Sequence, residues 1–192
     1  MADLTTVELV KTYQEITASG DDAFIGTLID AASNWIETVC AREFSDTIGT
    51  LTYDARNPVI IGRKLFFDRD VLDVISIVDA SGTLTSDTYH LLPNNYNPKY
   101  ALELKAGYGW TVDDVEGAIT VVARHGYCTT ANRPAAITHI ATLLTQWMYQ
   151  TRSVDTGAIQ VAAGVVEIPP DKQARAMQML QKGRFIRDAL FT

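Results

Sequence analysis

The sequence contains no motif typical of catalysis or cofactor binding. It has neither a Gly-x-Ser-x-Gly nucleophile elbow nor a Gly-Lys-Ser or Gly-Lys-Thr phosphate loop among its 192 residues. Gly107 and Gly109 lack the third glycine and the following helix of a dinucleotide fingerprint, so a turn is the favoured interpretation. We therefore expect a protein that is not an enzyme and has no cofactor.

Metal-ligating residues are scarce and poorly spaced. His90, His125 and His139 have no second histidine or glutamate at helical spacing, so a metal site would require convergence in the tertiary structure. The acidic cluster at residues 113–116 can attract a cation, but it lacks the alternating ligands and the glycine of a calcium-binding loop. A solvated loop is favoured there, and we expect no metal site.

Cysteines and long apolar runs are also lacking. Cys40 and Cys128 are too few for a disulfide framework and have no Cys-x-x-Cys spacing, which favours reduced thiols. No apolar run has the length needed to span a bilayer, and the first residues do not resemble a secretory signal. We expect a soluble protein made in a cytoplasm, without a membrane partner.

Basic residues are fewer than acidic ones, 16 against 23, which gives a net charge of -7. Such a chain repels the phosphates of nucleic acid, so direct DNA binding is disfavoured. The last part of the chain differs, because residues 170–192 hold five basic residues and only two acidic ones. We expect this basic tail to form a surface distinct from the acidic body.

Apolar residues at helical spacing predict two long amphipathic helices, at residues 21–40 and from Pro134 to about residue 152. Asp21 and Asp22 provide acidic charge at the start of the first, and Thr5 with Glu8 suggests a capping box for a shorter helix before it. Residues expected to pack the helices together are Phe24, Leu28, Trp35, Ile36, Ile140, Leu144 and Trp147. For the two tryptophans, core packing is favoured over a ligand box.

A region of period-two alternation lies between the two long helices. Strands are predicted at residues 50–53, 71–78, 88–92, 101–105 and 118–124, separated by turn-forming clusters. The predicted class is α+β: a helical bundle of two long helices plus short ones, with an inserted antiparallel sheet and a C-terminal helix and tail. The expected segments are 1–46, 47–127, 128–168 and 169–192, within one structural domain.

The tail combines apolar and basic side chains. A final helix is predicted over about residues 171–182, with Gly183 as its stop or hinge. Beyond it lie Arg184, Phe185, Ile186, Arg187, Leu190 and Phe191, residue types that are enriched at protein interfaces. Two interpretations stay open: a segment folded back on its own core, or a peptide-like element that docks on an acidic surface of a partner.

Two blocks of the sequence resemble the head-to-tail connector, or adaptor, proteins of tailed bacteriophages. The first runs from Leu9-Val10-Lys11 through the helix at residues 21–37 to Cys40-Ala41-Arg42-Glu43-Phe44. The second is Val121-Val122-Ala123-Arg124-His125-Gly126-Tyr127 followed by Arg133-Pro134-Ala135-Ala136-Ile137, similar to the family's final strand, glycine-aromatic turn and second major helix. The strands in between match in pattern more than in residues.

The resemblance implies a virion protein of the neck, at the junction between head and tail. It implies a homo-oligomeric ring, with twelve copies expected, that binds the portal protein, extends the DNA channel used in genome packaging and ejection, and presents a docking surface to a head-closure (stopper) or tail protein. Genomic DNA would pass through the channel without specific binding. Arg184, Phe185, Ile186, Arg187, Leu190 and Phe191 are the candidate portal-binding residues.

Two other classes stay open. A head-closure or tail-terminator protein would also form rings, but a chain dominated by strands is more typical of those proteins. A small enzyme with His90 or His125 as its acid-base group is the less favoured alternative.

Overall fold

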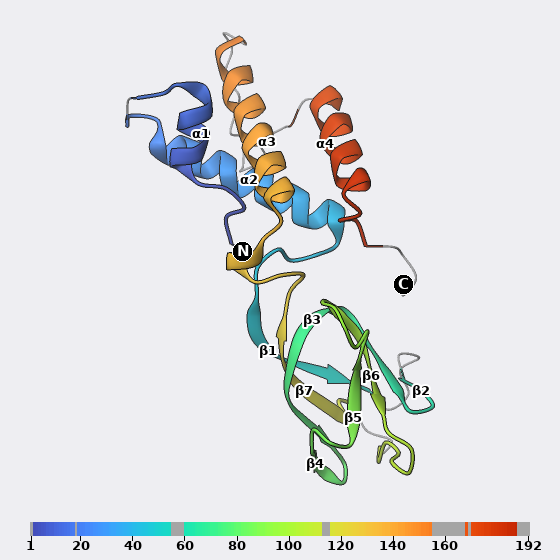
Figure 1. Cartoon of the computed structure of the whole chain (residues 1–192). Helices are drawn as coiled ribbons and strands as arrows, with labels where there is room; N and C mark the ends of the chain where they lie inside the picture. The colour runs from blue at the N-terminus through green and yellow to red at the C-terminus, as the bar shows by residue number, and fades with distance from the viewer. Residues whose placement is uncertain are drawn as a thin grey trace. The chain divides into compact units, whose positions relative to one another are not determined.

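The computed structural model describes residues 2–17, 19–54, 60–112, 116–154, 168 and 170–187. The chain divides into two compact units. The first unit contains the described residues up to Arg42 and from Arg133 onward, and the second runs from Glu43 to Asn132. The first is helical and the second is a β-sheet (Figure 1).

The helical unit has four helices in the described residues: α1 (Val7–Gln14), α2 (Asp22–Cys40), α3 (Ala135–Val154) and α4 (Pro170–Lys182). Helix α3 contacts each of the other three, and α1 also contacts α2. Figure 1 shows α1 and α4 on opposite sides of α3. Among these helices none is both long and apolar enough to cross a membrane.

Two features at the helix starts differ from the sequence prediction. The residue that caps α1 is Thr6, whose hydroxyl accepts a hydrogen bond from the backbone nitrogen of Leu9 at 3.2 Å. The predicted capping residue, Thr5, is buried instead and pairs with the hydroxyl of Thr142 at 2.7 Å. Asp21 precedes α2 but makes no side-chain cap, because its carboxylate accepts the hydroxyl of Tyr149 at 2.6 Å.

The core of the helical unit comes from the apolar faces of α2 and α3. Leu28 and Ile36 on α2 and Ile140 and Leu144 on α3 are all buried. Phe24, Trp35 and Trp147, which were expected in the same core, are only half-buried. Ala176 and Leu180 are the buried residues of α4, so this helix places a narrow apolar stripe against the unit.

The second unit is an antiparallel sheet whose main path has the order β1-β7-β3-β6-β5. Its strands are β1 (Thr47–Tyr53), β2 (Ile60–Ile61), β3 (Lys64–Asp79), β4 (Gly82–Leu84), β5 (Tyr89–Leu92), β6 (Lys99–Leu104) and β7 (Ile119–His125). A short 3₁₀ turn at Thr130–Asn132 precedes α3. The 16-residue strand β3 pairs with β2, β4, β6 and β7, and its register shifts at irregular positions. It is the central strand of the sheet.

The inner face of the sheet carries the core of the second unit. The alternation that predicted strands from the sequence places one residue in two on this face. The members of the core include Leu51, Leu65, Phe67, Val71, Ile77, Leu102, Leu104, Ile119 and Val121. Burial on one face explains why the strand register is well specified.

The α+β class predicted from the sequence is confirmed, whereas the predicted dominance of the helices over the sheet is not. The sheet of seven strands dominates the described residues, and a fold centred on a bundle of two long helices is not confirmed. The five predicted strands are present, with β3 beginning seven residues earlier than expected. The short strands β2 and β4 were not predicted, because two or three residues are too few to show a period.

Candidate functional site

The structure brings no metal site together in the residues it describes. None of their histidine, cysteine and acidic side chains form a group of three or more suited to hold an ion. His90 lies on β5, His125 on β7 and His139 on α3. Asp113 and Asp114 of the predicted acidic loop lie outside the described residues.

His125 has a packing role within the sheet unit. It is buried, and its Nδ1 atom lies 3.3 Å from the Oε2 atom of Glu43. A side chain at Gly49, on the neighbouring strand β1, would meet its imidazole ring. The lack of a side chain at Gly49 therefore makes room for His125.

Neither cysteine is suited to act as a nucleophile. Cys40 ends α2 and is fully buried, and burial raises the pKa of its thiol to about 11, while the charge of nearby Arg42 acts in the opposite direction. Cys128 is also buried, and its Sγ atom contacts the carbonyl oxygen of Phe44 at 3.6 Å. A neutral, buried thiol is a poor nucleophile.

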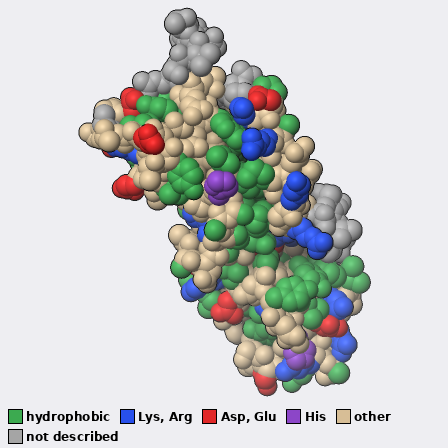
Figure 2. Space-filling model, turned by 45° about the horizontal axis from the view of Figure 1, so that its top comes forward, with side chains coloured by type: hydrophobic (Ala, Val, Ile, Leu, Met, Phe, Trp, Pro, Cys, Tyr) green, Lys and Arg blue, Asp and Glu red, His purple; other side chains and the backbone are tan. Residues whose placement is uncertain are grey.

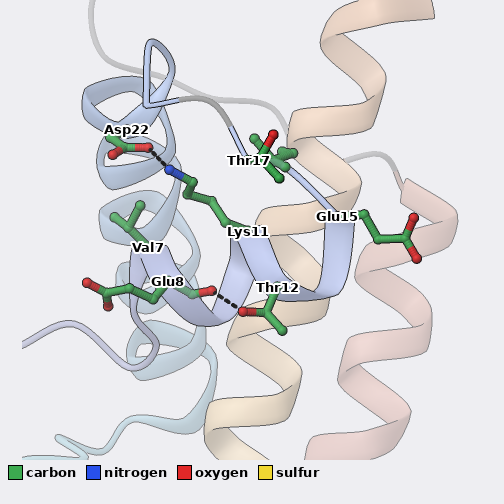
Figure 3. Close-up of a pocket in the computed structure, with 8 residues that line it drawn as sticks. Val7, Glu8, Lys11, Thr12, Glu15, Thr17 and Asp22 are labelled. Carbon is green, nitrogen blue, oxygen red and sulfur yellow. Dashed lines mark hydrogen bonds and ion pairs between the residues drawn. The ribbon is translucent and has the colours of Figure 1, made fainter.

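A pocket of about 410 Å³ opens beside α1 in the helical unit. Its lining comes from α1, the residues that follow it and the start of α2 (Figure 3), and consists of Val7, Glu8, Lys11, Thr12, Glu15, Ile16, Thr17 and Asp22. The Nζ atom of Lys11 pairs with Asp22 Oδ1 at 2.7 Å, so the positive charge of this pocket is already matched. Glu8 and Glu15 are exposed at its rim, which makes the pocket net acidic.

The opposite side of the helical unit is basic. Figure 2 shows Lys and Arg side chains along α4, acidic side chains around α1, and apolar side chains between them. Lys172 Nζ and the Arg175 guanidinium lie 5.5 Å and 5.9 Å from the centre of the Trp147 ring, close enough for cation–π attraction. The half-buried Trp147 therefore joins α3 to the basic helix.

The segment after α4 folds back on the helical unit. The backbone nitrogen of Phe185 donates to Leu180 O at 3.1 Å, and that of Arg187 donates to Cys40 O at 3.0 Å. The Phe185 side chain is only 7% exposed, and its ring lies where a side chain at Gly183 would be. Gly183 thus provides space for a ring, and the residue that takes the left-handed conformation at this helix end is Arg184.

These contacts separate the candidate portal-binding residues into three groups. The side chain of Phe185 is buried within the helical unit. Arg184 is exposed, and Ile186 and Arg187 are half-buried. Leu190 and Phe191 lie outside the described residues.

Sequence reasoning missed the acidic pocket, although the chain held a signal for it. Glu8 lies in the first turn of α1 and Glu15 directly follows its end at Gln14, so acidic charge at both ends of this helix was visible in the sequence. The pairing of Lys11 with Asp22 had no such signal, since it depends on how α1 meets α2.

Comparisons with known proteins identify the fold. No family model and no curated protein matches the chain. Two solved structures are similar over its whole length: the neck of an empty GTA (gene transfer agent) particle computed with C6 symmetry, and the neck of a native GTA particle computed with C12 symmetry. The first has a TM-score of 0.63 at 17% identity and the second 0.60 at 16%, and each match covers 100% of this chain and 96% of the other. The chain therefore has the fold of a protein found in a phage-like neck.

Proposed function

We propose that this chain is a structural, non-enzymatic subunit of the neck of a tailed-phage-like particle, and that it acts there as the head-to-tail connector. The observation that carries this proposal is the similarity to the two GTA neck structures, which covers all of this chain and 96% of each neighbour. A match of that extent includes both the helical and the sheet unit. It therefore concerns the whole chain, whereas a single common unit can recur in unrelated proteins.

The sequence supports the same role independently. The residues that resemble connector proteins end α2, at Cys40 to Phe44, and lead from β7 through Gly126 and Tyr127 toward α3. These are the points at which the chain passes between its two units. The resemblance thus includes the segments that connect the helical unit to the sheet unit.

In the proposed role, copies of the chain form a ring below the portal, with twelve copies expected. The C12 and C6 symmetries of the similar necks support a cyclic arrangement. A cyclic ring uses a heterologous contact, in which one patch of a copy meets a different patch of the next. The ring would extend the DNA channel and offer its other face to a head-closure or tail protein.

The C-terminal segment is the proposed portal-docking element. Arg184, Ile186 and Arg187 would provide its contacts together with Leu190 and Phe191, while Phe185 anchors the segment to its own unit. Basic side chains beside apolar ones suit an acidic partner surface. Binding of the portal by a chain that lacks residues 188–192 tests this role without removing the buried Phe185.

The neck role is tested by deleting the gene in the particle-producing host. We expect DNA-filled heads without attached tails, because the portal then lacks its docking partner, and restoration of complete particles by a plasmid copy. Particles with complete necks in the deletion strain would contradict the proposal. The readout is electron microscopy of purified particles.

Cross-linking of complete particles distinguishes the connector from other neck proteins. A connector is expected to give cross-links both to the portal protein and to other copies of itself. A head-closure or tail-terminator protein would give links to itself and to tail components, with none to the portal. Mass spectrometry of the linked peptides identifies the partners.

A further inference from the structure

Two charged patches lie on opposite sides of the helical unit. The α1 patch consists of Glu8, Thr12 and Glu15, and the α4 patch consists of Arg175, Gln178 and Lys182. All six side chains are exposed. Figure 1 shows α1 and α4 on either side of α3, and in Figure 2 acidic side chains gather on the flank where α1 lies and basic ones on the flank of α4.

The α1 patch is suited to receive cations. Figure 3 shows Glu8 and Asp22 at one end of the pocket and Glu15 at the other. Because Lys11 is paired with Asp22 at 2.7 Å, the two glutamates leave the pocket with an excess of negative charge. A volume of about 410 Å³ is sufficient for the long side chain of an arginine or a lysine.

The α4 patch is suited to supply those cations. Arg175, Gln178 and Lys182 are separated by three and four residues, so they lie along one face of α4. The buried Ala176 and Leu180 hold the opposite face against the unit, which fixes the direction of the exposed stripe. Residues 170–187 contain five basic side chains and one acidic one.

We propose that the α4 patch of one copy of this chain docks on the α1 patch of the next copy in the ring. This inference rests on the ring proposed above and names the surfaces that close it. A heterologous contact needs two different, complementary patches on different sides of one subunit, and the charges meet that requirement. A symmetric pair of copies would instead place like charges against each other, which is unfavourable.

The contact would set orientation more than affinity. Exposed ion pairs contribute little free energy each and are screened by salt. Association through this contact should therefore weaken as ionic strength rises.

Disulfide cross-linking tests the contact, because both native cysteines are buried. In the variant Thr12→Cys/Gln178→Cys each patch carries one thiol and keeps all its charges. Under mild oxidation we expect a ladder of linked dimers, trimers and larger species, at least five times more abundant than in the control Thr27→Cys/Gln178→Cys, whose first thiol lies on the exposed side of α2. Equal yields in the two variants would overturn the proposal.

Charge reversal in the cross-linkable variant gives a second test. Adding Arg175→Glu/Lys182→Glu should lower the yield to that of the control, and further adding Glu8→Lys/Glu15→Lys should restore it, because the charges are then exchanged rather than lost. A restored yield also shows that the variants fold. The matched control is the charge exchange Asp87→Lys/Lys105→Asp in the sheet unit. This exchange should leave the cross-linking yield unchanged.

The two proposals fail in different ways. Cross-links at control level, together with a chain that is present in the neck, would refute this contact and leave the connector role standing. A charge-dependent ladder from a chain that particles do not contain would refute the connector role and leave the contact between copies standing.

Discussion

Three residues other than glycine have left-handed backbone conformations in the described part of the chain, and each ends a helix. Glu15, Ala41 and Arg184 have φ values of 54°, 50° and 55°. At each, the residue that follows donates its backbone N–H five residues back, as Arg42 does to Glu37 O at 3.2 Å. This is the Schellman arrangement, in which glycine is usually preferred because it lacks a Cβ atom.

The substitution Ala41→Gly should stabilise the helical unit. Removing the Cβ atom relieves a cost of about 1 to 2 kcal/mol for the left-handed conformation, partly offset by the greater freedom of glycine in the unfolded chain. We expect a net gain of about 0.5 to 1 kcal/mol in the free energy of unfolding, measured by urea denaturation. The same change in the middle of α2, Ala31→Gly, should lower stability by about 1 kcal/mol. A loss at both positions would contradict this account.

Gly126 is required where β7 ends. It has a φ of 129°, and a Cβ atom there would collide with the carbonyl oxygen of Ser45, which belongs to the backbone and cannot move aside. Gly126→Ala should therefore destabilise the sheet unit by roughly 2 to 4 kcal/mol in thermal denaturation. Gly109→Ala is the matched control, because nothing lies near the added methyl group. Similar melting temperatures for the two variants would show that the close approach is not rigid.

Cys40 should react slowly with thiol reagents. Its pKa is raised from about 9 to about 11 by burial, so at pH 8 the folded protein holds roughly a hundredfold less thiolate than the unfolded chain. Because the folded state retains the proton, stability should fall as pH rises from about 9 to 11. In a Cys128→Ala background, we expect labelling to be slow at pH 8 and fast in denaturant. Equal rates in both conditions would contradict the burial of Cys40.

At the scale of elements, one lysine organises the loop between β5 and β6. Lys99 is buried at the start of β6, and its Nζ atom donates to the carbonyl oxygens of Pro93, Asn94 and Tyr96 at 2.7, 3.2 and 2.9 Å. The ammonium group thus satisfies three backbone acceptors of a loop that exposes Tyr96. Figure 1 places this loop at the end of the β5–β6 hairpin.

Replacing this lysine should loosen the loop without removing β6. Lys99→Met keeps most of the apolar stem and deletes the three hydrogen bonds, which should cost about 2 to 3 kcal/mol. Hydrogen exchange at the backbone amides of residues 94–97 should become faster, while exchange within β7 changes less. The control is Lys105→Met, because this lysine directly follows the other end of β6. Unchanged exchange in the loop would show that the lysine does not hold it.

The helices and the longer strands were predictable, because each carries its own period. The spacing of Leu28 and Ile36 on α2 and of Ile140 and Leu144 on α3 indicated the faces that are buried in the structure. Helix ends were less predictable. Thr5 and Thr6 are equally good capping residues by type, and only the burial of Thr5 against Thr142 decides between them.

At the scale of the whole molecule, the net charge of -7 bears on how a neck channel would treat DNA. A channel should let the duplex pass, and a protein that neutralises few phosphates gains little from counterion release. We expect the purified protein to leave duplex DNA unshifted in a gel even at low salt. As a control, the variant Glu8→Lys/Glu15→Lys tests whether added positive charge alone slows the migration of the DNA in the gel. A shift with the unmodified protein would contradict the passive role.

Period and charge are local properties of the chain, so they were sufficient to predict the α+β class, the order of the elements, the acidic body and the basic C-terminal part. They were not sufficient to predict which residues are available at the surface. Phe185 is of a residue type that is enriched at interfaces, but it is buried over Gly183. Glu8 and Glu15 form the rim of a pocket only because α1 meets the start of α2. Exposure depends on contacts between distant segments, and these contacts leave no period in the sequence.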